Sequence, residues 1–131
     1  MSLTTLTRQA PLTRDPARGE DCAALYPDAA PSVVALIRGA GGTSSYLSGL
    51  LRREADWLRP RLDMPLGQAL REVRVGEDLS PAALAPALRT AKRRAALLLA
   101  LADLGGAMEM AEVTRALTEF ADWAVGCAAA A

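Results

Sequence analysis

A glycine-rich stretch at residues 38–45 has the residue types that most directly suggest a ligand site. It reads RGAGGTSS, so three glycines and three hydroxyl side chains follow Arg38. Backbone amides in such a stretch, at the start of a helix, can cradle a phosphate. The stretch lacks the Lys-Ser/Thr pair of a P-loop, and no strand is predicted before it. We therefore interpret it as a turn between two helices that caps the second.

A second candidate is a group of positive side chains, Arg89, Lys92, Arg93 and Arg94. At this spacing a helix could grip a nucleic-acid backbone or an acidic protein. The chain has two Trp, two Tyr and one Phe, which is little support for a surface on which nucleic-acid bases stack. We interpret the group as a solvated helix face and retain it as the candidate interaction face. No nucleic acid is expected among the partners.

Carboxylate pairs are the remaining candidates for chemistry, because the sequence contains no histidine. The commonest general base and every histidine-ligated metal site are therefore excluded. Glu109 with Glu112, or Asp103 across the preceding turn, could bind a divalent ion. Favourable electrostatics at the start of a helix explain Glu109 and Glu112 without a bound metal ion. The sequence predicts no catalytic, cofactor-binding or metal-ligating residue.

The cysteine content and the hydropathy of the sequence indicate the cellular compartment of the chain. Cys22 and Cys127 are far apart in the sequence and form no C-x-x-C motif, so they favour a reducing compartment over a disulfide framework. The longest apolar run, residues 95–102, is far shorter than the roughly 20 residues that cross a bilayer. No signal peptide is recognised. We expect a cytoplasmic protein with no membrane partner.

The residues that would position any site are predicted to be helical. The chain has 28 Ala and 21 Leu against six Val and one Ile, a composition that favours helices over strands. Its 131 residues suit one domain. We predict an all-α fold, a small antiparallel bundle of about five or six helices around a long central helix near residues 81–104.

Proline, glycine and capping residues set the expected boundaries. Residues 1–19 are predicted to be a flexible leader, and residues 20–127 a single helical domain. The predicted segments are a turn within 20–30, a helix that starts at Pro31 and ends at the glycines 39, 41 and 42, a helix capped by residues 43–45, a short segment at 56–58, and helices at 65–75 (capped by Asp63 and ended by Gly76), 81–104 and 110–127.

Charge is unevenly distributed along this helical chain. Residues 38–94 carry eleven positive and six negative side chains, whereas residues 103–131 carry one positive and five negative. Two readings remain open from the sequence. The segments attract each other when the helices pack, or they dock against further domains.

Two stretches resemble a known family. Residues 42–58, GTSSYLSGLLRREADWL, resemble the "S-P-Y-L-x-x-L-L-x-R-x-P-x-x-L" helix of the glutamine synthetase adenylyltransferase family. Residues 88–106, LRTAKRRAALLLALADLGG, with residues 112–124, EVTRALTEFADWA, are similar to that family's "L-R-R-x-K/R…L-x-A-x-x-D-L-x-G…L-E-x-V-T-x-A-L-S-x-F-A-D" segment. Two prolines of the first motif are replaced, by Ser45 and Ala55.

The resemblance implies a place in a bifunctional enzyme that adds AMP to glutamine synthetase and removes it. It covers about residues 30–125 and corresponds to the helical N-terminal region. The family's chemistry belongs to a Gly-Ser turn and an Asp-x-Asp metal pair, and neither occurs in this sequence. ATP and magnesium are therefore expected of the parent enzyme and not of this chain. The alanine run at 128–131 would then be the cut end of a longer protein.

The function implied is a non-catalytic helical domain that packs against or orients the following nucleotidyltransferase domain in nitrogen regulation. The adjoining catalytic domain is the expected partner, with glutamine synthetase or a PII-type regulator as further candidates. Two alternatives stay open from the residues. One is a free-standing helical adaptor that binds a protein through the Arg89–Arg94 face or through an apolar groove between the last two helices. The other is phosphate or nucleotide binding at residues 39–45.

Overall fold

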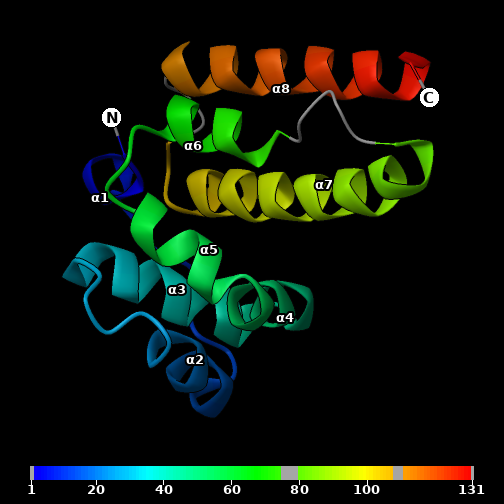
Figure 1. Cartoon of the computed structure of the whole chain (residues 1–131). Helices are drawn as coiled ribbons and strands as arrows, with labels where there is room; N and C mark the ends of the chain where they lie inside the picture. The colour runs from blue at the N-terminus through cyan, green and yellow to red at the C-terminus, as the bar shows by residue number, and fades with distance from the viewer. Residues whose placement is uncertain (1, 75–79, 108–110, 131) are drawn as a thin grey trace.

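Short apolar segments bounded by Pro, Ser and Gly build a stack of helices (Figure 1). The computed structural model describes residues 2–74, 80–107 and 111–130. This part of the chain confirms the all-α prediction but holds eight α-helices, more than the five or six expected. They are α1 (Leu3–Leu6), α2 (Pro16–Ala23), α3 (Pro31–Thr43), α4 (Ser45–Arg53), α5 (Ala55–Leu58), α6 (Leu66–Val73), α7 (Pro81–Leu104) and α8 (Ala111–Ala130), with a 3-10 turn, η1, at Arg59–Arg61.

The long central helix α7 has the predicted bounds. The Ser80 hydroxyl accepts a hydrogen bond from the Ala83 amide, and Pro81 occupies the first helical turn. At the other end Gly106 has a φ of 84°, a left-handed conformation that glycine adopts without steric cost. Because local residues set both ends, the sequence was enough to place this helix.

Helix α7 separates two layers of the molecule. On one side lies α6, which is itself covered by α8, so α6 sits between α7 and the antiparallel α8 (Figure 1). On the other side lie α3 and α4, and α2 covers them from below in the same view. The fold is therefore a layered stack, in which consecutive helices α7 and α8 are held apart by an earlier one.

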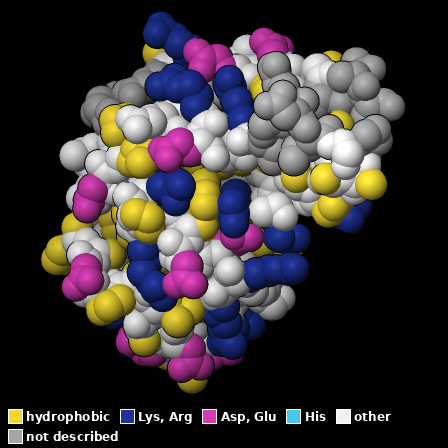
Figure 2. Space-filling model, viewed as in Figure 1, with side chains coloured by type: hydrophobic (Ala, Val, Ile, Leu, Met, Phe, Trp, Pro, Cys, Tyr) yellow, Lys and Arg dark blue, Asp and Glu magenta, His cyan; other side chains and the backbone are white. Residues whose placement is uncertain are grey.

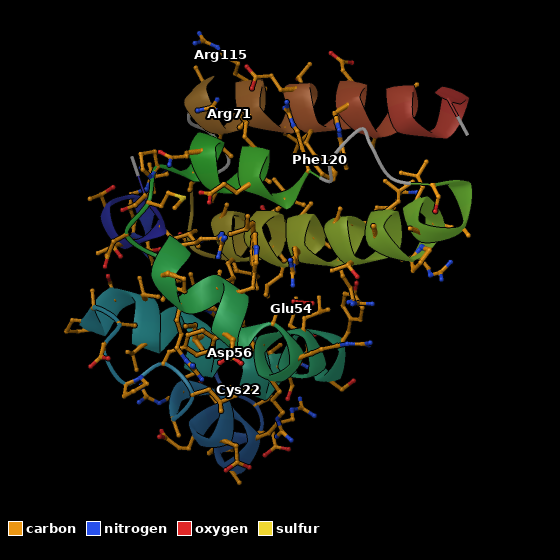
Figure 3. The ribbon with its side chains drawn as sticks, in the orientation of Figure 1. Cys22, Glu54, Asp56, Arg71, Arg115 and Phe120 are labelled. Atoms are coloured by element: carbon orange, nitrogen blue, oxygen red, sulfur yellow. The ribbon has the colours of Figure 1, made fainter. Side chains whose placement is uncertain are left out.

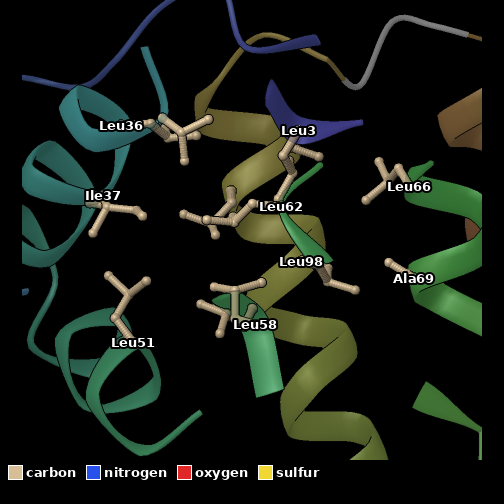
Figure 4. Close-up of a cluster of buried hydrophobic side chains, with 14 of the residues drawn as sticks. Leu3, Leu36, Ile37, Leu51, Leu58, Leu62, Leu66, Ala69 and Leu98 are labelled. Atoms are coloured by element: carbon tan, nitrogen blue, oxygen red, sulfur yellow. The ribbon is translucent and has the colours of Figure 1, made fainter. Parts of the chain in front are cut away.

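The buried side chains of α7 supply the centre of the core. Ala91, Ala95, Leu98 and Ala102 recur at spacings of three and four and are buried. Figure 4 shows Leu98 between a group that includes Leu58 and a group that includes Leu66. Burial of Leu97 and Leu101 as well confirms that the C-terminal half of α7 is central to the fold.

Residues 2–15 are packed against the rest of the chain, which corrects the prediction of a flexible leader at residues 1–19. Leu3 and Leu6 are buried in the core. The Thr4 hydroxyl donates to the Leu62 carbonyl at 3.1 Å or to the Asp63 carboxylate at 2.6 Å. The Arg8 amide donates to the Gly105 carbonyl at 2.9 Å. These partners lie far along the chain, so local composition gave no sign of them.

Replacing Thr4 with valine is expected to lower the free energy of unfolding by about 1 kcal/mol, because the shape is kept and the hydroxyl's hydrogen bonds are lost. Urea denaturation followed by circular dichroism measures the change. Thr118→Val on the exposed side of α8 is the control, since that hydroxyl bonds only within its own helix, to the Thr114 carbonyl. Equal losses from the two variants would contradict a structural role for the Thr4 contacts.

Two predicted helix boundaries were wrong. Helix α3 continues through the glycines at 39, 41 and 42 to Thr43, because these glycines are buried against other segments. Asp63 does not cap α6, which begins at Leu66 without a side-chain cap, and its carboxylate bonds Thr4 instead. The predicted stop at Gly76 lies outside the described residues.

Candidate functional site

A buried carboxylate brings together half of the predicted interaction face. Glu54 follows the last residue of α4 and its side chain is only 5% exposed. Its Oε2 accepts from Arg94 Nε at 2.9 Å, and its Oε1 lies 3.6 Å from Arg93 Nε. A buried charge needs such partners because the low-dielectric interior penalises it. We call Glu54, Arg93 and Arg94 the Glu54 cluster.

Trp57 extends this cluster on the side of α5. The Arg61 guanidinium carbon lies 4.5 Å from the centre of a Trp57 ring, and that of Arg94 lies 5.1 Å from it. Both distances are within the range of a cation–π contact. Arg61 also donates to the Trp57 carbonyl at 2.6 Å. The indole therefore connects α5 and η1 to α7.

The structure thus divides the four predicted face residues into two pairs. Arg93 and Arg94 are partly buried in the Glu54 cluster, whereas Arg89 and Lys92 are exposed. Among the described residues, neither Arg89 nor Lys92 has an ion-pair partner. The part of the predicted face that is available to another molecule is therefore smaller than the sequence indicated.

Glu54 and Trp57 were not predicted as members of a site, although a signal for Glu54 was present. Glu54 follows Leu47 by seven positions and Leu50 by four, so it continues the buried side of α4. A carboxylate at such a position requires a cation nearby. Nothing in the sequence indicated which arginine would supply it.

The glycine-rich stretch does not form the loop that phosphate binding would require. Residues 39–43 lie inside α3, so most of their amides serve the helix. A Cβ placed on Gly39 would lie 2.4 Å from the Pro11 carbonyl oxygen, and one on Gly41 would lie 2.5 Å from Cys22 Sγ. The glycines allow close packing, and the Ser44 hydroxyl caps α4 by accepting from the Leu47 amide at 3.1 Å. We therefore do not retain the phosphate-site alternative.

The remaining titratable candidates are dispersed. Cys22 is buried and unpaired, with its Sγ 3.4 Å from the Ser48 hydroxyl. Asp103 is exposed at the end of α7. The side chains of Glu109, Glu112 and Cys127 lie outside what the structure describes. Among the described residues, no group of three His, Cys, Asp or Glu side chains could hold a metal ion. Figure 3 shows how far Cys22, Glu54 and Asp56 lie from Arg71 and Arg115.

Some of the unevenly distributed charges form ion pairs with each other within the chain. Glu119 of α8 lies 3.7 Å from Arg71 of α6 and 3.9 Å from Arg74, which follows α6. These contacts support the reading that the two charged segments attract each other when the helices pack. They do not involve the cations of α4 and α7, which remain on another side of the molecule.

One surface cavity lies between the α2–α3 turn and η1. It has a volume of about 310 Å³ and is lined by Tyr26, Asp28, Ala29, Arg59, Pro60, Leu62 and Asp63. Burial raises the pKa of the Tyr26 phenol, whose hydroxyl donates to the Leu51 carbonyl at 2.7 Å. Arg59 donates to the Leu25 carbonyl and pairs with Asp56. These polar groups tie the segment after α2 to α4 and η1, and each is already engaged in a contact within the chain.

No family model, curated protein or solved structure matches the chain. The helices that the structure describes include none that is both long and apolar enough to cross a membrane.

Proposed function

We propose that the chain is the non-catalytic N-terminal helical domain of an enzyme of the glutamine synthetase adenylyltransferase type. One observation carries the proposal. The two stretches that resemble this family, residues 42–58 and 88–124, meet in the Glu54 cluster. Glu54 and Trp57 come from the first stretch, and Arg93 and Arg94 from the second. These four residues occupy positions that the quoted motifs leave unspecified, so the support comes from the packing of the two stretches into one unit.

In this proposal the domain orients the following deadenylylating domain and performs no reaction itself. The parent enzyme's ATP and magnesium would be held by its Gly-Ser and Asp-x-Asp residues, which this sequence lacks. Glutamine synthetase and a PII-type regulator are further partners to test. A cytoplasmic location is proposed because Cys22 is an unpaired thiol.

The proposal predicts that this chain acts only together with the rest of its enzyme. The encoding reading frame is expected to continue into a segment with Gly-Ser and Asp-x-Asp. The remainder of that frame, expressed separately, should remove AMP from adenylylated glutamine synthetase faster when this chain is added in equimolar amount. Release of labelled AMP or ADP measures the rate.

The control is this chain incubated alone with adenylylated glutamine synthetase, phosphate and magnesium. Turnover by the chain alone would contradict a non-catalytic role. A reading frame without a nucleotidyltransferase segment would instead favour the second candidate, a free-standing adaptor. That candidate draws its support from Arg89 and Lys92, which are exposed and have no ion-pair partner among the described residues.

A further inference from the structure

The exposed side of α4 differs from a simple solvated helix face. Tyr46, Gly49 and Arg53 follow one another at spacings of three and four residues, so they lie on one side of α4. Tyr46 is 62% exposed although it is a large aromatic residue. Tyrosine and arginine are the residue types that most often anchor protein–protein interfaces.

Gly49 is not explained by the packing of the domain. A Cβ at this position would meet no atom within 4 Å, so the fold would accept alanine. Glycine inside a helix is destabilising relative to alanine. This cost is offset if another backbone must approach α4 closely at this point, because the distance between packed helices depends on the side chains at the contact.

Arg89 of α7 lies close to this side of α4. Arg53 precedes Glu54, whose carboxylate contacts Arg93, and Arg89 lies one turn before Arg93 on the same side of α7. Figure 2 shows Lys and Arg side chains gathered where α4 meets α7. Arg52 is 3.8 Å from Asp21, while Arg53, Arg89 and Lys92 have no ion pair with any described residue. Positive charge is therefore in excess.

We propose that this surface docks an acidic helix of a protein partner. The surface, here called the α4–α7 face, consists of Tyr46, Gly49 and Arg53 of α4 with Arg89 of α7. Acidic side chains on the partner would pair with Arg53 and Arg89, and an apolar residue would cover Tyr46. The partner's backbone would pass closest to α4 at Gly49. A nucleic acid would not need that close approach and would find only one exposed aromatic side chain here.

The test measures binding to a probe of defined chemistry. A fluorescent helical peptide of about three heptads, with glutamate on one face and leucine at its edge, is titrated with the full chain by anisotropy. A peptide with lysine in place of glutamate and a single-stranded DNA oligonucleotide are titrated in parallel. We expect saturable binding of the acidic peptide only. Equal binding of the lysine peptide, or tighter binding of the DNA, would overturn the proposal.

Two charge-reversal variants locate the binding on the surface. The double variant Arg53→Glu/Arg89→Glu should weaken binding about tenfold or more, because two ion pairs become repulsive contacts. Arg115→Glu, on exposed α8, is a charge-reversal control and should leave the affinity within about twofold. Unchanged affinity in the double variant would overturn the proposal.

Gly49→Ala separates docking from folding. The variant should raise the melting temperature of the free chain, because alanine is the better helix former. It should also weaken peptide binding about threefold or more, because the added methyl group lies where the two backbones approach most closely. A variant that is more stable and binds as tightly as the parent would contradict close docking at Gly49. The outcome does not depend on which enzyme the chain belongs to.

Discussion

The double variant Arg93→Met/Arg94→Met is expected to lose about 3 kcal/mol of unfolding free energy. It would leave the Glu54 carboxylate, which is 5% exposed, without either of its cations. Removing one side of a buried ion pair costs about 3–5 kcal/mol. The lower end applies because both arginines are partly exposed, so water can reach the vacated positions. Methionine retains most of the apolar stem, which limits the loss of packing. Urea denaturation measures the shift in midpoint.

Two further variants show whether the loss arises from the unpaired carboxylate. Glu54→Met alone should cost less, about 1 kcal/mol, because the freed guanidinium groups can turn toward solvent. The triple variant with all three substitutions should recover most of the double variant's loss, since no buried charge remains. Arg89→Met/Lys92→Met, which also removes two cations from α7, should change stability by less than about 0.5 kcal/mol. Equal losses in the two double variants would contradict a specific role for Glu54.

Helices whose ends are set by neighbouring residues could be predicted from the sequence. Ser80 and Pro81 start α7, and Ser44 starts α4. Each signal acts within one turn of the residue that it caps, so no knowledge of tertiary structure is needed. The all-α fold and the central place of α7 followed from the same local information.

Features that depend on distant contacts could not be predicted. Residues 1–19 were predicted to be a leader because Leu3 and Leu6 form no extended periodic pattern, yet both side chains are buried in the core. Gly39 was predicted to end a helix, but α3 continues through it because Pro11, almost 30 positions earlier, packs closely against it. Local sequence contains a residue's preferences and not the identity of its tertiary neighbours.

The residues of the candidate interaction face were predicted from the sequence, but their arrangement in space was not. The sequence placed four cations on one helix, and the spacing of Arg94 from the buried Leu98 and Leu101 already placed it nearer the buried side than Arg89. Glu54, 40 positions earlier, decides which of them turn inward. The exposed part of the face then continues onto α4, through Arg53 and Gly49, which only the packing of α4 against α7 revealed.

At Gly19, where α2 and α3 approach closely, substitution with alanine is expected to lower the free energy of unfolding by about 2 kcal/mol. A Cβ at Gly19 would lie 2.6 Å from the Arg38 carbonyl oxygen and 2.9 Å from Thr13 Cγ2. The first is backbone of α3, so the two helices must move apart. Overpacking of this kind costs about 1–3 kcal/mol, more than the gain of up to about 1 kcal/mol from helix propensity. The melting temperature should fall by several degrees.

Gly49→Ala in the free chain is the matched comparison, because it makes the same substitution inside another helix where a Cβ meets nothing within 4 Å. Propensity then acts alone and the melting temperature should rise. Opposite signs for the two variants would show that Gly19 is needed for contact between α2 and α3, whereas Gly49 is not needed by the fold. If both variants were stabilised, α2 would not pack as closely on α3 as described. If both were destabilised, α4 would have a neighbour at Gly49 within the free chain, and docking of a partner there would lose its strongest support.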